Sequence, residues 1–200
     1  MYLIKDFKET CPIYELMNVL ISAIEAKDQY TKGHSDRVVD VTEWLCNALK
    51  LTDYEMKNML LAAHLHDIGK IFVPDAILNK PTALNDEEWC IIKKHPQYGF
   101  DILLNVSHFE PILNTILYHH ERWDGMGYPR GISKEEIPLG ARILAIADAI
   151  DAMLSTRSYR KALSIDACIK ELNENAGKQF DPELITIAVK YVLRAASQTA

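Results

Sequence analysis

The sequence has few cysteines, and no two of them lie close together. Cys11, Cys46, Cys90 and Cys168 are spread widely along the 200 residues. None belongs to a CxxC pair of the kind found in zinc ribbons and in thiol–disulfide sites. The spacing therefore favours reduced, buried thiols in a cytosolic protein.

The chain also lacks long apolar runs and an excess of basic residues. No apolar stretch approaches the roughly 20 residues that cross a bilayer, and no basic start with an apolar run marks a secretory signal. We therefore expect a cytoplasmic protein with no membrane partner. The formal net charge of -6 argues against binding to a DNA or RNA polymer. A small anionic substrate is not excluded, because bound metal ions would add positive charge.

The sequence shows no alternating strand pattern, no internal repeat and no low-complexity segment. Helical spacing of apolar residues dominates, and it predicts an all-α fold whose 48% hydrophobic residues suffice for a sizeable core. Thr52 with Glu55 forms a capping box at a helix start, and Asn85 with Glu88 can cap another. Prolines and glycines predict loops at 71–84 and 122–140. Helices are predicted from about Pro12, and at about 34–49, 52–65, 85–95, 111–121, 139–154, 166–176 and 182–195. Pro96 would interrupt the helix that reaches His95 or start another one.

Seven histidines are the most informative residues for function: His34, His64, His66, His95, His108, His119 and His120. A lone histidine is more often structural than a ligand, so their neighbours decide the interpretation. His66 and Asp67 end one predicted helix, and His119 with His120 ends another before a glycine-rich loop. Adjacent residues on a helix point about 100° apart. The two adjacent histidines can therefore share a site only at the end of their helix.

Asp148 lies in an otherwise apolar helix, where a carboxylate is costly to bury unless it is paired or binds a metal. Asp151 follows one turn later near the same face. The alternative is that both acids face solvent, which the apolar neighbours of Asp148 disfavour. Imidazole and carboxylate groups together suit a first-row transition metal. Because one carboxylate can bridge two metals, Asp67 is the best candidate for a bridging ligand.

These residues belong to an ordered series of motifs that resembles an HD-GYP domain, the branch of the HD phosphohydrolases that degrades cyclic di-GMP. The resemblance covers about residues 15 to 195 in the family's order. A lone HD dipeptide would carry almost no weight, whereas the whole series is highly specific. The motifs are YTKGHSDRV from Tyr30, HLHDIGKIFVPDAIL from His64, KPTAL from Lys80, KHPQYG from Lys94, HHERWDGMGYP from His119, IPLGARILAIADAIDAM from Ile137, TRSYRKAL from Thr156 and FDPEL from Phe180.

The resemblance implies an HD-domain helical bundle with a central metal site. We expect residues 15–200 to form this catalytic domain and residues 1–14 to be an extension or a linker remnant. Asp67 would bridge the metals, while His64 and His108 match no ligand position and are expected near the core and in a surface loop. The implied metal ligands are His34, His66, Asp67, His95, His119, His120 and Asp148.

Three cationic residues match positions that bind substrate in the family. The resemblance implies that Lys70 contacts the scissile phosphate, where a cation stabilises developing negative charge. Arg157 and Arg160 match positions that hold substrate phosphates, although arginines on such a surface are also common without a ligand. The glycine-rich loop through Tyr128 would shape the substrate pocket or contact a partner domain.

One departure from the family pattern bears on the number of metals. Some relatives have a glutamate four residues before the first histidine, where it helps to hold a third metal. Tyr30 stands at that position here, and a neutral phenol is a poor substitute. We therefore expect two divalent ions, with iron or manganese favoured by the ligands.

The predicted function is metal-dependent hydrolysis of cyclic di-GMP to pGpG, with GMP as the product of any second cut. A hydroxide activated by two metals would attack the phosphorus, with Asp67 and Lys70 as the catalytic residues. Two alternatives stay open: hydrolysis of a mixed cyclic GMP-AMP, and a sensor or docking module with little turnover. A sensory or receiver domain, a diguanylate cyclase and a second copy of the chain are the protein partners considered.

Overall fold

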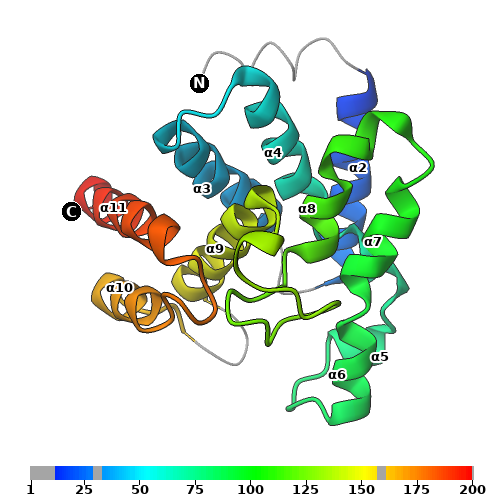
Figure 1. The fold of residues 1–200 in the computed structure, drawn as a ribbon. Helices are drawn as coiled ribbons and strands as arrows, with labels where there is room; N and C mark the ends of the chain where they lie inside the picture. The colour runs from blue at the N-terminus through cyan, green and yellow to red at the C-terminus, as the bar shows by residue number, and fades with distance from the viewer. Residues whose placement is uncertain (1–11, 29–32, 157–160, 200) are drawn as a thin grey trace.

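The computed structural model describes residues 12–28, 33–156 and 161–199. Within these ranges the chain is helical and forms no strands beyond one isolated bridge between Ala176 and Phe180, which confirms the all-α prediction (Figure 1). The helices are α2 (Pro12–Lys27), α3 (His34–Ala48), α4 (Asp53–Leu65), α5 (Asp75–Leu78), α6 (Asp86–Ile92), α7 (His95–Leu103), α8 (Leu113–Tyr118), α9 (Leu139–Leu154), α10 (Ile165–Glu174) and α11 (Pro182–Thr199), with short 3₁₀ helices η1 (Ile68–Phe72), η2 (Ser107–Ile112) and η3 (Lys134–Glu136).

Helix α9 occupies the middle of the bundle in Figure 1 and contacts α3, α4, α8, α10 and α11. Two clusters of buried apolar side chains hold the helices together. The first joins α3, α9, α10 and α11, and the second joins α2, η1, α7, η2 and α8. Helix α4 belongs to both clusters, since Ala63 lies in the first and Leu65 in the second. The C-terminal end of α4 is therefore fixed from two sides.

The predicted capping boxes are present. The Thr52 hydroxyl accepts a hydrogen bond from the Glu55 amide, and the Glu55 carboxylate accepts one from the Thr52 amide. Asn85 and Glu88 form the same pair of bonds before α6. Each box satisfies two amide groups that a helix start leaves without intrahelical partners, so these helices begin where the sequence predicted.

Three predicted boundaries were wrong. The segment 71–84 was predicted to be a loop, but it contains the end of η1 and all of α5; a helix of four residues is too short to show a period. The helix predicted to open at Pro111 begins at Leu113, and the proline lies in η2. Helix α6 ends at Ile92 and not at His95, whereas the start of a second helix at Pro96 was one of the two predicted alternatives, since α7 opens at His95 with Pro96 in its first turn.

A close contact at Gly69 brings two parts of the site together. A Cβ atom at this residue would lie 2.0 Å from the carbonyl oxygen of His95 and 2.5 Å from the amide nitrogen of Gly99. Only a residue without a side chain allows η1 to lie this close to the start of α7. The contact places Asp67, which precedes η1, beside His95.

The prediction of buried thiols holds for two of the three cysteines within the described residues. All three are free; Cys46 and Cys168 are buried, whereas Cys90 is exposed on α6, so the prediction was wrong for Cys90. Helix α6 has no buried residue, which explains that exposure. Burial raises the pKa of the Cys46 thiol to about 12 and that of the Cys168 thiol to about 11. Cys11 lies outside the described residues. Across the described ranges, no helix combines the length and apolar character needed to cross a membrane.

Candidate metal centre

The first group of predicted ligands consists of His34, His66 and Asp67. His34 is the first residue of α3, His66 follows the last residue of α4, and Asp67 comes next. One ligand atom from each lies within 4.8 Å of the others, and all three residues are buried. The two imidazole Nε2 atoms are 3.4 Å apart.

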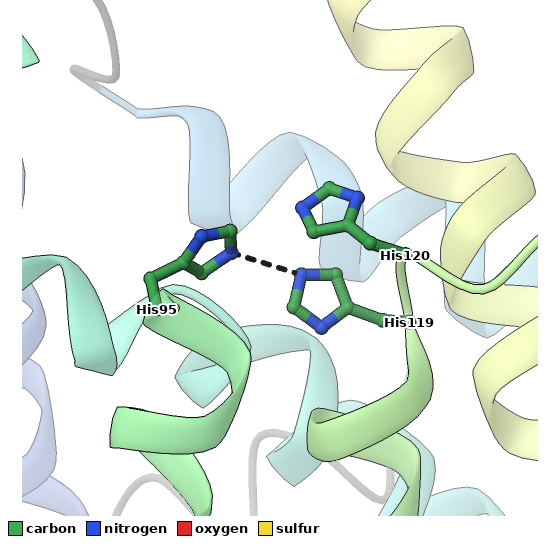
Figure 2. Close-up of side chains that lie close together, drawn as sticks. All are labelled: His95, His119 and His120. Carbon is green, nitrogen blue, oxygen red and sulfur yellow. Dashed lines mark hydrogen bonds between the residues drawn. The ribbon is translucent and has the colours of Figure 1, made fainter. Parts of the chain in front are cut away.

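The second group consists of His95, His119 and His120, whose ligand atoms also lie within 4.8 Å of one another. His95 opens α7, and the other two directly follow the last residue of α8 (Figure 2). The Nε2 atoms of His95 and His119 are 3.3 Å apart, as the dashed line in Figure 2 marks. The centroids of the adjacent His119 and His120 rings are 4.0 Å apart. The two rings thus share one site at a helix end, as their adjacency requires.

Asp67 lies between the two groups. Its Oδ1 atom is 3.4 Å from Nε2 of His95, and its Oδ2 atom is 3.4 Å from Nε2 of His66. Burial alone would raise the pKa of this carboxyl, but the positive charge of Lys70 holds it well below its ordinary value. Asp67 is therefore an anion with one oxygen facing each group, which is the arrangement that a bridging ligand needs.

In three of the histidine rings, the nitrogen that points away from the centre, Nδ1, is hydrogen-bonded to the backbone carbonyl of the residue three positions earlier. A carbonyl oxygen can only accept, so Nδ1 carries the proton and Nε2 keeps its lone pair for the interior of the site. Outer hydrogen bonds of this kind fix the orientation of metal-binding histidines. The pairs are His66 with Ala63 at 2.8 Å, His95 with Ile92 at 2.8 Å and His119 with Ile116 at 2.6 Å.

Asp151 fixes the orientation of the His34 ring in the same way, through a hydrogen bond to its Nδ1. Its Oδ2 atom lies 2.7 Å from Nδ1 of that ring, and Arg37 binds its other oxygen. Asp151 is only 5% exposed, so the alternative that it faces solvent was wrong. Burial would raise its pKa, but hydrogen bonds from His34 and Arg37 lower it to about 2. Its only signal in the sequence was its place one turn after Asp148.

Asp148 is half-buried at the edge of the first group, with Oδ1 3.5 Å from Nε2 of His34. It faces the site and not bulk solvent, as its apolar neighbours in the sequence predicted.

The three histidines of the second group are neutral at physiological pH. Burial, reinforced by neighbouring cations, lowers the pKa of His95 to about 4. Burial and the adjacent imidazoles lower the pKa values of His119 and His120 well below the ordinary value. Neutral imidazole is the form that binds metals, so these side chains are ready to act as ligands.

Lys70 lies directly beside the bridging position. Its Nζ atom is 2.7 Å from Oδ2 of Asp67 and 3.3 Å from Oδ2 of Asp28, which follows α2. Burial would lower the pKa of this lysine, but the two carboxylates raise it above its ordinary value, so it is charged. The contact with Asp28 was missed, because Asp28 is 42 residues away in the sequence and lies in no motif with Lys70.

The glycine-rich loop packs against the second group. The Tyr128 amide donates to the carbonyl of His120 at 3.2 Å, and the centroids of the two rings are 4.9 Å apart. Glu121, only 3% exposed, accepts hydrogen bonds from the amides of Arg130 at 2.6 Å and Gly131 at 3.0 Å. This role of Glu121 was also missed, although its place directly after two histidines offered a signal.

The remaining predicted residues fall into two classes. His64 is buried in α4, near the core as predicted, and His108 is exposed as predicted, although it lies in the 3₁₀ helix η2 and not in a loop. Arg157 and Arg160, expected to hold substrate phosphates, lie outside the described residues, as does Tyr30, so those roles stay predictions.

Comparisons with known proteins all point to one family. The model of the HD domain family matches residues 18–184. The chain is 37% identical to a cyclic di-GMP phosphodiesterase of Thermotoga maritima, covering 89% of this chain and 49% of the relative. It is 40% identical to the cyclic di-GMP phosphodiesterase response regulator RpfG of Xanthomonas campestris, over 86% and 46% of the two chains. A 3'3'-cGAMP-specific phosphodiesterase of Vibrio cholerae is 41% identical, over 80% and 35%. This chain thus spans half or less of the length of these relatives.

Solved structures share the fold. A cyclic GMP-AMP specific phosphodiesterase of V. cholerae superposes with a TM-score of 0.68 at 20% identity, covering 89% of this chain and 49% of that one. The HD domain of the L. monocytogenes phosphodiesterase PgpH gives 0.64 at 18% identity, over 90% and 98%. Together with the motif series, these matches show that this chain belongs to the HD domain family, as one of its HD-GYP members.

Proposed function

We propose that this protein is a metal-dependent phosphodiesterase that hydrolyses a cyclic dinucleotide, with cyclic di-GMP as the preferred candidate. One observation carries the proposal. Imidazole Nε2 atoms from separate helix ends converge on the two oxygens of a single carboxylate, Asp67, beside the charged ammonium of Lys70.

The donor set fits two divalent metal ions. The first group supplies two nitrogens and one oxygen, and the second supplies three nitrogens. Asp67 can serve both groups, and Asp148 adds an oxygen at the edge of the first. Such a mixture suits iron or manganese. When bound, ions of this kind supply a water-derived nucleophile at neutral pH and Lewis acidity toward phosphoryl oxygens.

The protein groups have distinct tasks in this proposal. Asp67 shares its charge between the two groups, and Asp151 with the backbone carbonyls holds the imidazole rings in place. Lys70 supplies a buried positive charge next to Asp67, where it can stabilise charge that develops on a phosphate. Arg157 and Arg160 are proposed to bind substrate phosphates, on the strength of their match to the family motif.

The names of the relatives guide the choice of substrate. Those of T. maritima and X. campestris are cyclic di-GMP phosphodiesterases, which supports cyclic di-GMP as substrate and pGpG or GMP as product. Three relatives from V. cholerae are 3'3'-cGAMP-specific phosphodiesterases, and they make the mixed dinucleotide the second candidate.

Anaerobic incubation with iron(II) or manganese(II), and with each dinucleotide in turn, tests the proposal. We expect chromatography to show metal-dependent formation of linear dinucleotide or mononucleotide. A His66→Ala/Asp67→Ala double variant, which lacks two donors of the first group, should form none. Wild-type protein with confirmed metal occupancy that forms no product from either dinucleotide would contradict the proposal. Tight dinucleotide binding without turnover would instead identify a sensor.

A further inference from the structure

A cyclic dinucleotide carries two phosphodiesters in one ring, so the second phosphate stays near the metal centre while the first is cleaved. Resting on the proposed function, this chemistry favours an anion-binding group at the edge of the site in addition to Lys70. Several nearby cations are already neutralised by carboxylates. Lys70 pairs with Asp67 and Asp28, Arg37 with Asp151, and Arg122 with Asp124.

Lys93 differs from these cations. It is exposed, and across the described part of the chain no carboxylate oxygen lies within ion-pair distance of its ammonium group. Its backbone is fixed, because its amide donates to the carbonyl of Trp89 at 2.9 Å. It lies two residues before His95, in the turn where the His95 ring binds the carbonyl of Ile92. The lysine is therefore anchored to the same turn that positions His95.

The side chain of Lys93 reaches toward the histidines of the second group. Its Nζ atom lies 5.6 Å from the centroid of the Tyr128 ring. That ring is 4.9 Å from the ring of His120, which in turn is 5.0 Å from the ring of His95. The ammonium group is thus held at the edge of the second group by an aromatic ring that packs on one of its members.

The contact with Tyr128 leaves the charge of Lys93 available. Burial raises the pKa of the phenol above its ordinary value, so the ring is neutral and forms no ion pair. A cation above an aromatic face is attracted by the ring, which restricts where the ammonium lies. Its three N–H donors can still bind an anion. Among the described cations around the centre, Lys93 combines a defined position with an unpaired charge.

We propose that Lys93 is a substrate-binding residue that receives the phosphate of the cyclic dinucleotide that is not being cleaved. A lysine in this role binds as a point charge and requires no particular orientation of the phosphate. It should therefore strengthen binding of a substrate with two phosphates, and contribute little to one with a single phosphodiester.

Steady-state kinetics of Lys93→Ala, Lys93→Arg and Lys94→Ala test this role. Each variant is assayed with the cyclic dinucleotide that wild type cleaves and with bis(p-nitrophenyl) phosphate, which has one phosphodiester. For Lys93→Ala we expect KM for the dinucleotide to rise about tenfold, the effect of one charge-assisted hydrogen bond. The kcat value, the metal content and activity on the small ester should stay unchanged. Lys93→Arg should retain most affinity, and Lys94→Ala, which removes the neighbouring exposed lysine, should match wild type.

Two results would overturn the proposal: an unchanged KM in Lys93→Ala, or an equal loss of activity on both substrates, which would show that the lysine supports the centre itself. Equilibrium dialysis with radiolabelled dinucleotide separates this proposal from the proposed function. Wild type that binds without turnover would refute hydrolysis, and weaker binding by Lys93→Ala would still support the phosphate contact. If wild type neither binds nor cleaves a dinucleotide, both proposals fail.

Discussion

At the scale of single residues, the centre depends on side chains that hold the expected ligands. Asp151 is the clearest case, because it binds Nδ1 of His34 at 2.7 Å while Arg37 balances its charge. Its effect on His34 is visible in the pKa of that ring. Burial would lower this pKa, but the bond to Asp151 and the nearby charges of Asp148 and Asp67 raise it above its ordinary value.

Replacement of Asp151 tests whether it supports metal binding through His34. Because outer-shell partners of metal-binding histidines typically change metal affinity by about 10- to 100-fold, we expect Asp151→Ala to weaken manganese binding by this factor. Titration of chelator-treated protein with manganese measures the effect. Ser155→Ala is a matched control, since it removes a hydrogen bond to Asp151 at 3.0 Å but leaves the contact with His34. Wild-type affinity in Asp151→Ala would show that His34 needs no such support.

At the scale of elements, the site is built from helix ends. His34 and His95 open helices, while His66 and His119 follow the last residues of α4 and α8. The last carbonyls of a helix have no intrahelical partner, so a histidine just beyond the end can bind one of them through Nδ1. The same turn that ends the helix thereby aims Nε2 at the centre.

The loop after α8 offers a second test at this scale. Glu121→Ala leaves the amides of Arg130 and Gly131 without their buried acceptor, which should lower the free energy of unfolding by about 1–3 kcal/mol. Because the loop carries Tyr128, we also expect KM for the dinucleotide to rise while the metal content is retained. Thermal unfolding and kinetics measure the two effects. Glu135→Ala, which removes an exposed acid of η3, should change neither. An unaltered KM would mean that the loop does not shape the substrate site.

At the scale of the whole molecule, folding forces neutral histidines into one small volume. The expected ligands lie in α3, α7 and α9 or directly after α4 and α8, and these helices belong to two apolar clusters that share α4. The favourable burial of these clusters offsets the cost of bringing the imidazoles and carboxylates together. The stability of the metal-free protein should therefore depend on protonation of the site.

The direction of that dependence follows from the pKa shifts. The pKa of His95 falls from its ordinary value of 6.5 to about 4 on folding, and the pKa values of His119 and His120 also fall. The unfolded chain then binds more protons than the folded one, so stability is lost as pH falls from about 6.5 toward 4. The raised pKa of His34 acts in the opposite direction but is one group against three.

Thermal unfolding in excess chelator at several pH values measures this dependence. We expect the melting temperature to be lower at pH 5 than at pH 7, and His95→Gln to show a smaller difference than wild type. A melting temperature that is independent of pH across this range would contradict the expected neutral, buried state of the histidines.

Much of the fold follows from local sequence signals. The helix at Leu139–Leu154 was predicted with its observed bounds, and the capping boxes at Thr52 and Asn85 mark real helix starts. Local hydrogen bonds and apolar periodicity suffice for such elements, because both depend on residues three or four positions apart. The order of the motifs likewise singled out the histidines of the two groups that the structure places around Asp67. The same order of motifs was sufficient to predict the family.

Other features depend on tertiary structure alone. His34 and Asp151 meet although 117 residues separate them, and the contacts of Glu121 with the loop and of Lys93 with Tyr128 likewise join separate turns. Local periodicity predicts which face of a helix is buried, but not which distant side chain that face will meet. That choice is made by the packing of helices around α9, which sets the distances between their ends. Local sequence signals were thus sufficient to predict most of the helices, the candidate ligands and the family, whereas the residues that hold those candidates in place follow from the packing of distant helices.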